Sequence, residues 1–384
     1  MRSLIFILLL INFSIKNIFA QELPTSLKNA EFYFLIDANT REVLLSKNAD
    51  IRVAPSSMTK MMTAYVVFSQ IKKGYINLNN QCLIGRDAYR KSGSTMFLNY
   101  GDVVTIDELL RGLLAVSGND AAIALAQASA GGYQNFIKLM NEAAKKIGLK
   151  NSHFKNPHGL NEPNHYMSLR DLAILTAHIY EEFPQYSHYF SIPEFTYGKI
   201  TQKNRHPLIK SHYEGQVGGK TGHTNQGGYG AVSVVQKQNR KLIAVVNKAK
   251  TPHIRGQIVT DLVDFGFKRY KKLVLFQKNQ AIAKLPVWLG LQDSVLALTN
   301  HEIALNVAQN ISLSDVSVKI KFLNPLKAPI AKGEKIADLI IEVKGFRNLQ
   351  YSLFASDNIT KVGFLERFSI IFSYKFNKLI NKIF

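Results

Sequence analysis

The sequence of 384 residues contains one cysteine and one tryptophan, and it has 27 acidic residues against 48 lysines and arginines. A single cysteine, Cys82, cannot form an internal disulfide and has no cysteine partner for a metal site. We therefore expect Cys82 to be a small buried apolar residue. Without a disulfide, the folded chain must be stabilised by its core and its size alone. The sequence also lacks repeats and low-complexity stretches, as in an ordinary globular protein.

Two common hydrolase signatures are missing as well. The chain has no Gly-x-Ser-x-Gly elbow, which removes the main feature of the α/β-hydrolases. Its ten histidines include no His-Glu-x-x-His pattern, so a zinc peptidase is not indicated. We expect neither a metal ion nor another cofactor.

The shortage of acidic residues gives a net charge of +21, a balance often found in nucleic-acid-binding proteins. The first twenty residues favour a different interpretation. Arg2 precedes an apolar run that is too short for a comfortable membrane span, and Ala20 ends the segment. We interpret residues 1–20 as a secretory signal peptide, with an uncleaved N-terminal anchor as the alternative. A basic exported protein is expected to meet an anionic membrane surface or cell-wall polymer, and no nucleic acid.

The hydrophobic pattern of the first half predicts strands at both ends of a helical block. Residues 31–37 and 42–47 favour a hairpin, and residues 227–237 and 241–248 favour two further paired strands. Helical patterns occupy residues 106–116, 120–129, 133–149, 168–183 and 256–270. This order predicts an α/β (α+β) domain over residues 21–273, with an antiparallel sheet built from both ends of the domain and helices packed on it.

From about residue 275 the helical period disappears. Short strand-like runs at 281–290, 303–308, 317–323 and 336–345 predict a small all-β domain over residues 274–360. In residues 361–384, large apolar residues recur at helical spacing with basic residues between them. That pattern is typical of an amphipathic helix lying in a membrane interface. A helix docked on its own domain is the alternative.

The stretch 54-APSSMTKMMTAYVVF-68 combines two serines, a lysine and an apolar run. Pro55 and Ser56 favour a helix start here, with Ser56 as its N-cap. Residues three apart share one face of a helix, so the Lys60 amine would lie within reach of the Ser57 hydroxyl. An adjacent amine is one way to activate a serine without histidine.

Single matches to the relevant motifs are weak, because Ser-x-x-Lys and Ser-x-Asn each occur three times. One ordered set is more specific. Ser57–Lys60 begins a helix, Ser117–Asn119 lies between two helices, and Lys220-Thr221-Gly222 opens the later strands. This is the motif order of serine β-lactamases and penicillin-binding proteins.

The residue types in this set suit acyl transfer. Ser57 would attack a carbonyl, and Lys60 would take its proton if burial and nearby cations lower the lysine pKa. Ser117 would relay that proton to the leaving amine. The backbone N–H groups of Ser57 and His223 would form an oxyanion hole.

The remaining motif residues suit substrate binding. Asn119 would hold the substrate backbone, while Lys220 and Thr221 would bind a substrate carboxylate. Gly222 would allow close backbone approach along a strand. For His158 and His223 a purely structural hydrogen-bonding role remains the alternative.

Beyond the three motifs, the sequence closely resembles the low-molecular-mass penicillin-binding proteins that are D-alanyl-D-alanine carboxypeptidases. The resemblance runs from about residue 25 to the C-terminus. It includes 55-PSSMTKMMT-63, 93-GSTMFLNYGD-102, 117-SGNDAA-122, 158-HGLNEP-163, 202-QKNRH-206, 219-GKTGHT-224 and 249-AKTPHIR-255. It implies a transpeptidase/β-lactamase-like catalytic domain, a β-rich C-terminal domain, and an amphipathic tail on the outer, periplasmic face of the cytoplasmic membrane.

The resemblance also implies a reaction. The penultimate D-alanine of a peptidoglycan stem pentapeptide would acylate Ser57, the terminal D-alanine would leave, and water would hydrolyse the acyl-enzyme. β-Lactam antibiotics would act as inhibitors. Carried over by position, Arg205 and Arg255 would join Thr221 and His223 near the substrate carboxylate. One departure is Asn161, where family members often have an aspartate after His-Gly-Leu; turnover would be slow if that carboxylate assists deacylation.

Two alternatives stay open. A serine β-lactamase shares the motif set, although no clear Glu-x-x-x-Asn segment lies between the second and third motifs, and the extra domain and tail suit a membrane-bound wall enzyme better. A non-catalytic protein that binds the cell wall or maintains cell shape is the alternative from another class.

Overall fold

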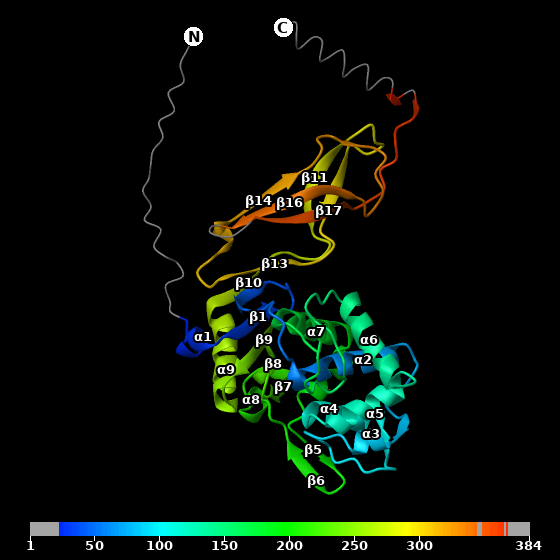
Figure 1. Cartoon of the computed structure of the whole chain (residues 1–384). Coiled ribbons are helices and arrows are strands. Elements are labelled where there is room, and N and C mark those ends of the chain that lie inside the picture. Colours follow the sequence, from blue (N-terminus) through cyan, green and yellow to red (C-terminus); the bar gives the residue numbers. More distant parts are fainter. Residues whose placement is uncertain (1–22, 344–347, 365, 368–384) are drawn as a thin grey trace.

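The computed structural model describes residues 23–343, 348–364, 366 and 367. These residues form a larger region of helices and sheet, labelled α1 to α9 in Figure 1, and a β region beyond it. The expected signal peptide and most of the expected tail helix lie outside the described residues. Among those that are described, no helix is both long and apolar enough to cross a membrane.

The larger region is built on one five-stranded sheet in the order β2-β1-β9-β8-β7. Its strands are β1 (Phe32–Asp37), β2 (Val43–Lys47), β7 (Gln216–Thr224), β8 (Gly228–Lys237) and β9 (Arg240–Ala249). All four pairings are antiparallel, and β1 lies beside β9 with Phe32 opposite Asn247. The expected sheet, joined from both ends of the region, is therefore confirmed.

Helices cover both faces of this sheet. On one side, α9 (Pro252–Arg269) packs on β8 and β9 and also contacts α1 (Thr25–Asn29) and α8 (Pro207–Lys210). On the other side, α7 (Leu169–Glu182) contacts β1 and β9 and belongs to the helical block. That block consists of α2 (Lys60–Lys72), α4 (Ile106–Ala115), α5 (Asn119–Ser129), α6 (Tyr133–Lys146) and α7 (Leu169–Glu182). The two faces have separate apolar cores, so every residue of β1 is buried.

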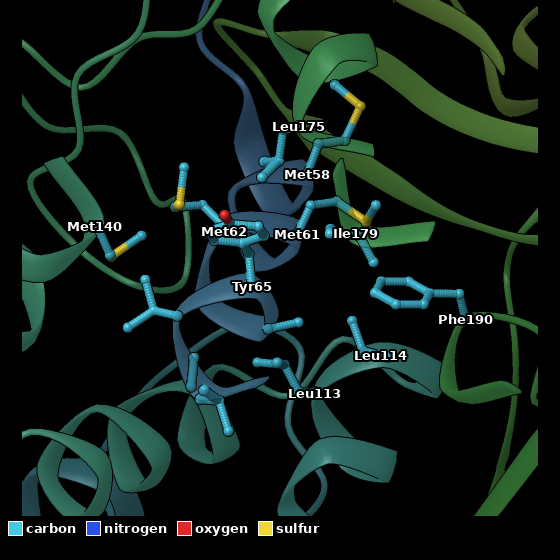
Figure 2. Packing of buried hydrophobic residues seen from close by; sticks show 14 of the residues in the cluster. Met58, Met61, Met62, Tyr65, Leu113, Leu114, Met140, Leu175, Ile179 and Phe190 are labelled. Atoms are coloured by element: carbon cyan, nitrogen blue, oxygen red, sulfur yellow. The ribbon is translucent and has the colours of Figure 1, made fainter. Parts of the chain in front are cut away.

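Helix α2 runs through the centre of the helical block. Figure 2 shows side chains of this segment, including Met61, Met62 and Tyr65, among apolar side chains of the surrounding elements. Ten of the 13 residues of α2 are buried, because its sequence is apolar on every side. The expected burial of this segment is confirmed, and it fixes the position of the Ser57–Lys60 pair at its start.

The start of this helix differs from the prediction. Residues Ser56–Thr59 form a separate 3₁₀ turn, η1, and α2 begins only at Lys60. Ser56 does not act as an N-cap; it has φ +50°, and its Oγ lies 3.0 Å from Oγ1 of Thr224 on β7. The N-cap prediction was wrong because the Ser56 hydroxyl bonds to a distant strand.

Caps elsewhere follow the sequence more closely. The side chain of Ser168 accepts a hydrogen bond from the Asp171 N–H and caps α7, at the start of the helical pattern predicted over residues 168–183. Thr105 and Glu108 form a reciprocal capping box at the start of α4. Helix α9 begins at Pro252, four residues before the predicted start, with Thr251 as its cap.

Several short elements were not predicted. They are β3 (Gln81–Leu83), α3 (Arg86–Tyr89), β4 (Val103–Thr105), η2 (Pro184–Phe190), β5 (Glu194–Tyr197), β6 (Ile200–Lys203) and α8. Cys82, on β3, is buried and free, as expected. These segments connect the major elements, and β6 and α8 contribute directly to the candidate site.

The β region contains two sheets. Strand β10 (Tyr270–Phe276) pairs with β13 (Ile303–Ala308), and the other sheet has the order β14-β16-β17-β12-β11-β15. The strands of that six-stranded sheet are β11 (Ala281–Trp288), β12 (Ser294–Leu298), β14 (Val316–Lys321), β15 (Leu326–Lys327), β16 (Lys335–Val343) and β17 (Leu349–Ala355). The expected all-β domain is confirmed, and the boundary expected near residue 273 falls inside β10.

Polar contacts join the two regions. The Asn306 backbone N–H donates to Glu42 Oε2 at 2.7 Å, and its side-chain amide donates to Glu42 Oε2 and Thr40 Oγ1. Gln309 Nε2 donates to the backbone oxygens of Phe267 and Tyr270. The β1–β2 turn is therefore one contact point for the β region.

Candidate active site

The 3₁₀ turn that carries Ser57 lies against two glycines. A Cβ at Gly222 would lie 2.9 Å from the Pro55 carbonyl oxygen, so the glycine lets β7 approach the turn closely. Gly159 has φ +85°, and a Cβ there would lie 1.9 Å from the Ser56 carbonyl oxygen. Both positions therefore require glycine to keep Ser57 in place.

Lys60 lies directly behind Ser57. Its side chain is fully buried, and its Nζ lies 3.1 Å from Ser57 Oγ. The same nitrogen donates to Asn119 Oδ1 at 2.7 Å and to the His158 carbonyl oxygen at 2.8 Å. The structure thus brings together the residue pair that the spacing predicted, with two further oxygens around the amine.

The surroundings of Lys60 favour its uncharged form. Burial lowers the pKa of Lys60 well below its ordinary value, and the nearby Lys220 and Arg205 lower it further. The buried carboxylate of Asp120 acts in the opposite direction but does not outweigh them. A neutral amine beside a serine hydroxyl is a general base in position.

Ser117 and Lys220 form a second hydroxyl–amine pair. Lys220 Nζ donates to Ser117 Oγ at 2.9 Å and to the Thr221 carbonyl oxygen at 3.1 Å. Burial, with Arg205 and Arg255 nearby, lowers the pKa of Lys220 to about 7. Ser117 lies in the tight link between α4 and α5 and has φ +68°. The left-handed backbone conformation therefore occurs at a residue of the candidate site.

Asn119 and Asp120 begin helix α5 and position the neighbouring loop. Asn119 Nδ2 donates to the Ser92 carbonyl oxygen at 2.8 Å. The buried Asp120 carboxylate accepts from the backbone N–H groups of Met96 and Leu98. Sequence analysis missed Asp120, although it follows Asn119 directly, because nothing in the sequence shows that its carboxylate binds a loop.

Arg205 and Arg255 form a cationic side of the site. Arg205 Nη2 donates to Ser94 Oγ and to the Val116 carbonyl oxygen, both at 2.9 Å. Arg255 is buried, and its Nη2 donates to the Arg205 carbonyl oxygen at 3.1 Å. Burial lowers the pKa of Arg255 to about 10, so it remains charged at neutral pH.

A pocket of about 740 Å³ opens over these groups. Its lining comprises Ser57, Ser94, Ser117, Lys203, Asn204, Arg205, Pro207, Lys210, Thr221, Gly222, His223, Tyr229, Pro252, His253 and Arg255. The predicted residues Lys60, Asn119 and Lys220 are buried and do not line it. A pocket of about 800 Å³ between β1, β2 and α7 contains none of the predicted residues, so chemistry and not size identifies the site.

The two histidines singled out from the sequence have different positions. The His223 ring lines the pocket and stacks on Tyr229, with ring centroids 3.8 Å apart. The His158 ring accepts from the Leu160 N–H, and burial lowers its pKa to about 2. The His158 ring is therefore neutral and structural, and only its backbone oxygen contacts Lys60.

Asn161, the departure from the family pattern, lies elsewhere. It is exposed and lines a separate pocket of about 490 Å³ together with Arg52, Glu162 and His165. It is not among the residues that line the Ser57 pocket. The geometry places its side chain away from that pocket, in which an acyl group on Ser57 would lie.

Comparisons with known proteins agree across both regions. The family described as D-alanyl-D-alanine carboxypeptidase matches residues 19–251, and the C-terminal domain of penicillin-binding protein 5 matches residues 270–361. The chain is 35% identical over 335 residues to the D-alanyl-D-alanine carboxypeptidase DacF of Bacillus subtilis, with 86% of each chain covered.

Two relatives from Haemophilus influenzae extend this similarity. The D-alanyl-D-alanine carboxypeptidase DacA is 36% identical over 323 residues, which is 82% of this chain and 81% of the relative. The crystal structure of penicillin-binding protein 5 is similar with a TM-score of 0.82 at 33% identity, covering 86% of this chain and 98% of that chain. Both the sequence and the fold are therefore shared over most of the chain.

Proposed function

Since this chain belongs to the D-alanyl-D-alanine carboxypeptidase family of low-molecular-mass penicillin-binding proteins, we propose that Ser57 is the nucleophile of its serine-type D,D-carboxypeptidase reaction. The substrate is the peptidoglycan stem pentapeptide, and the terminal D-alanine is released. The observation that carries this assignment is the fully buried Lys60 amine 3.1 Å from Ser57 Oγ.

The partners of Lys60 explain how it acts as a base. A neutral amine has two N–H donors and one lone pair. Asn119 Oδ1 and the His158 carbonyl oxygen can only accept, so they take the two N–H groups. The lone pair then faces the Ser57 hydroxyl and accepts its hydrogen bond.

The reaction follows from this arrangement. Ser57 Oγ forms a bond to the carbonyl carbon of the penultimate D-alanine while its proton passes to Lys60 Nζ. The backbone N–H groups of Ser57 and His223 donate to the oxyanion. The C–N bond to the terminal D-alanine then breaks, and the proton returns through the Ser117 hydroxyl to the leaving amine. Water hydrolyses the resulting ester and restores Ser57.

The terminal carboxylate of the substrate binds on the cationic side of the site. Lys220 and Arg205 supply positive charge, and Thr221 supplies a hydroxyl for a hydrogen bond. Arg255 donates a hydrogen bond to the carbonyl oxygen of Arg205 and so holds Arg205 in place. The guanidinium of Arg255 also adds positive charge beneath Arg205. This binding requires no metal ion or cofactor.

We place the protein on the periplasmic face of the cytoplasmic membrane, as a peripheral protein. The signal-like residues 1–20 and the amphipathic pattern of residues 361–384 support this placement. Deleting the residues after Gly363 is expected to release the protein from membranes without loss of activity on soluble peptide. Fractionation of cells that express both forms tests this, and a truncated protein still found on membranes after signal cleavage rejects the anchor.

The central experiment measures intact protein mass after brief exposure to benzylpenicillin, together with D-alanine release from a pentapeptide ending in D-Ala-D-Ala. We expect a lasting penicilloyl adduct and D-alanine release for the wild type, and neither for Ser57→Ala. Rapid loss of the adduct with hydrolysed antibiotic would indicate a β-lactamase instead. An adduct without D-alanine release would indicate a non-catalytic role at the wall.

A further inference from the structure

The lining of the Ser57 pocket contains no carboxylate. It includes four lysine and arginine side chains: Lys203, Arg205 and Lys210, which are exposed, and Arg255, which is buried. Four other pockets in the described part of the chain each include at least one acidic residue, namely Glu181, Glu162, Glu42 with Glu302, and Asp357. The absence of acidic groups is therefore a property of this pocket, and it does not simply follow from the net charge of the chain.

The cations of the pocket are not neutralised by neighbouring side chains. Arg205 donates to a hydroxyl and a carbonyl, and Arg255 donates to a carbonyl. Lys203 lies opposite Glu194 in the β5–β6 pairing, yet the ion pairs found among the described residues include none between these two side chains. The pocket consequently keeps a positive potential for an anionic ligand.

One carboxylate uses only part of this charge. The terminal α-carboxylate of the substrate has two oxygens, which Thr221 and Arg205 can bind directly while the charge of the buried Lys220 lies behind them. Lys203, Lys210 and His253 remain, and we call these three residues the outer group. All three are exposed and line the pocket, so a ligand can reach them.

The fold places the outer group beside Arg205, which would bind the substrate carboxylate, and beside Arg255, which supports Arg205. Lys203 ends β6, two residues before Arg205, and His253 lies in the first turn of α9, two residues before Arg255. Lys210 ends α8, which packs on that first turn: a Cβ at Gly256 would lie 3.4 Å from Pro207 Cβ. We therefore expect the outer group to lie closer to the leaving residue than to the acyl part of the substrate.

We propose that the outer group binds a second carboxylate on the leaving group, so that the enzyme releases terminal D-amino acids with acidic side chains in preference to neutral ones of the same size. This inference rests on the proposed carboxypeptidase function. The bonds that form and break are the same as for terminal D-alanine, and only the side chain of the leaving residue differs. Lys203 and Lys210 supply the charge, and His253 supplies a ring nitrogen for a hydrogen bond.

The test compares peptides that differ only in their last residue: D-Ala, D-Gln, D-Glu and D-Lys. D-Gln and D-Glu have the same shape, so the ratio of their kcat/KM values reports the charge alone. We expect the wild type to favour D-Glu by about threefold to tenfold, the range for one or two exposed ion pairs. The preference should disappear at about 1 M salt, where the Debye length is about 3 Å.

Variants locate the effect. Lys210→Gln is expected to lower the D-Glu to D-Gln ratio toward one, and Lys210→Glu is expected to raise the ratio of D-Lys to D-Gln above its wild-type value. Lys146→Gln makes the same charge change at an exposed position of α6 that does not line the pocket, and its ratio should equal that of the wild type.

The outcomes separate the two proposals. If the wild type releases no D-alanine from the D-Ala peptide, the proposed function fails. If it releases D-alanine but treats D-Glu and D-Gln alike, the outer group is only a set of solvated charges and this inference is overturned. A D-Glu preference that survives Lys210→Gln and the Lys203→Gln, Lys210→Gln double variant equally overturns it.

Discussion

The interiors of the two folded regions differ in kind. In the larger region, fully or nearly fully buried residues include Lys60, Lys220, Asp120 and Arg255, all close to Ser57. In the β region the core consists of leucine, isoleucine, valine and alanine, and Thr299 and Asn306 are the buried polar residues among those described. The core of the β region stabilises its fold. The interior of the larger region also contains ionisable groups, whose burial opposes folding but makes the chemistry possible.

The larger region can accommodate those groups because its apolar core is extensive. Around α2, the Phe68 ring lies within contact distance of Phe183, Tyr186, Tyr189 and Phe190. Aromatic side chains contribute large buried areas, and such clusters stabilise a fold strongly. The buried lysines therefore belong to the region that has the larger apolar core.

The largest expected effect comes from replacing the buried amine of Lys60 with an apolar side chain. Lys60→Met removes the proton acceptor of Ser57, so the rate of acylation by benzylpenicillin should fall by about 10²–10⁴. Thermal stability should change little, because the cost of burying an amine disappears while Asn119 and His158 lose a donor. The rate of penicilloyl-adduct formation measures the loss. Lys146→Met is the matched exposed control, and wild-type acylation by Lys60→Met would refute the role of Lys60.

A pair of glycines tests whether backbone strain matters equally in both regions. Gly159→Ala should lower the free energy of unfolding by at least about 3 kcal/mol and slow acylation by about tenfold to a hundredfold, because the Ser56 carbonyl must move. Gly333 in the β region has a similar φ, +78°, but nothing lies within 4 Å of its would-be Cβ. Gly333→Ala should cost about 1 kcal/mol and leave acylation unchanged. Equal effects in denaturant titration and acylation assays would contradict this contrast.

The titration of Lys220 provides a smaller effect. With a pKa of about 7, Lys220 is charged below that pH and holds the substrate carboxylate, and it loses its charge as the pH rises above it. We expect kcat/KM for a D-Ala-D-Ala peptide to fall by about tenfold above neutral pH. Lys220→Arg keeps its charge, so its pH–rate profile should lack this decline. The same decline in both proteins would assign it to another group.

The smallest effect is expected at the junction of the two regions. Asn306→Ala removes the amide donor to Thr40 and Glu42 but keeps the backbone donor, so stability should fall by at most about 1 kcal/mol. Acylation should stay within about twofold of the wild type. A clear loss of acylation rate would show that the β region influences the active site, and the two regions would then not be functionally independent.

Sequence patterns predicted much of this structure, because they depend on local periodicity. Helices α4 to α7, the β1–β2 hairpin and strands β8 and β9 all follow from the spacing of apolar residues. The motif order indicated Ser57, Lys60, Ser117 and Lys220, and in the structure these residues form two hydrogen-bonded pairs, Lys60 with Ser57 and Lys220 with Ser117.

Other features depend on contacts between distant residues and leave no local signal. The 3₁₀ turn at Ser57 is joined to β7 by a hydrogen bond between Ser56 and Thr224, 168 residues apart. Lys60 donates to the backbone oxygen of His158. Every residue type has such an oxygen, so the sequence gives no sign of this contact. The burial of Asp120 and the outer group of the pocket likewise appear only when the chain is folded.

The adjacency of β1 and β9 has a consequence for the order of assembly. Phe32 pairs with Asn247 in the middle of the sheet, so the first strand to be synthesised must wait for more than 200 residues before its partner exists. Pairings so distant in sequence close slowly. Lys220 comes from β7, on the same late part of the chain, and the catalytic lysines therefore cannot be buried together until the whole region has been made. We therefore expect the active site to form late in the folding of the larger region.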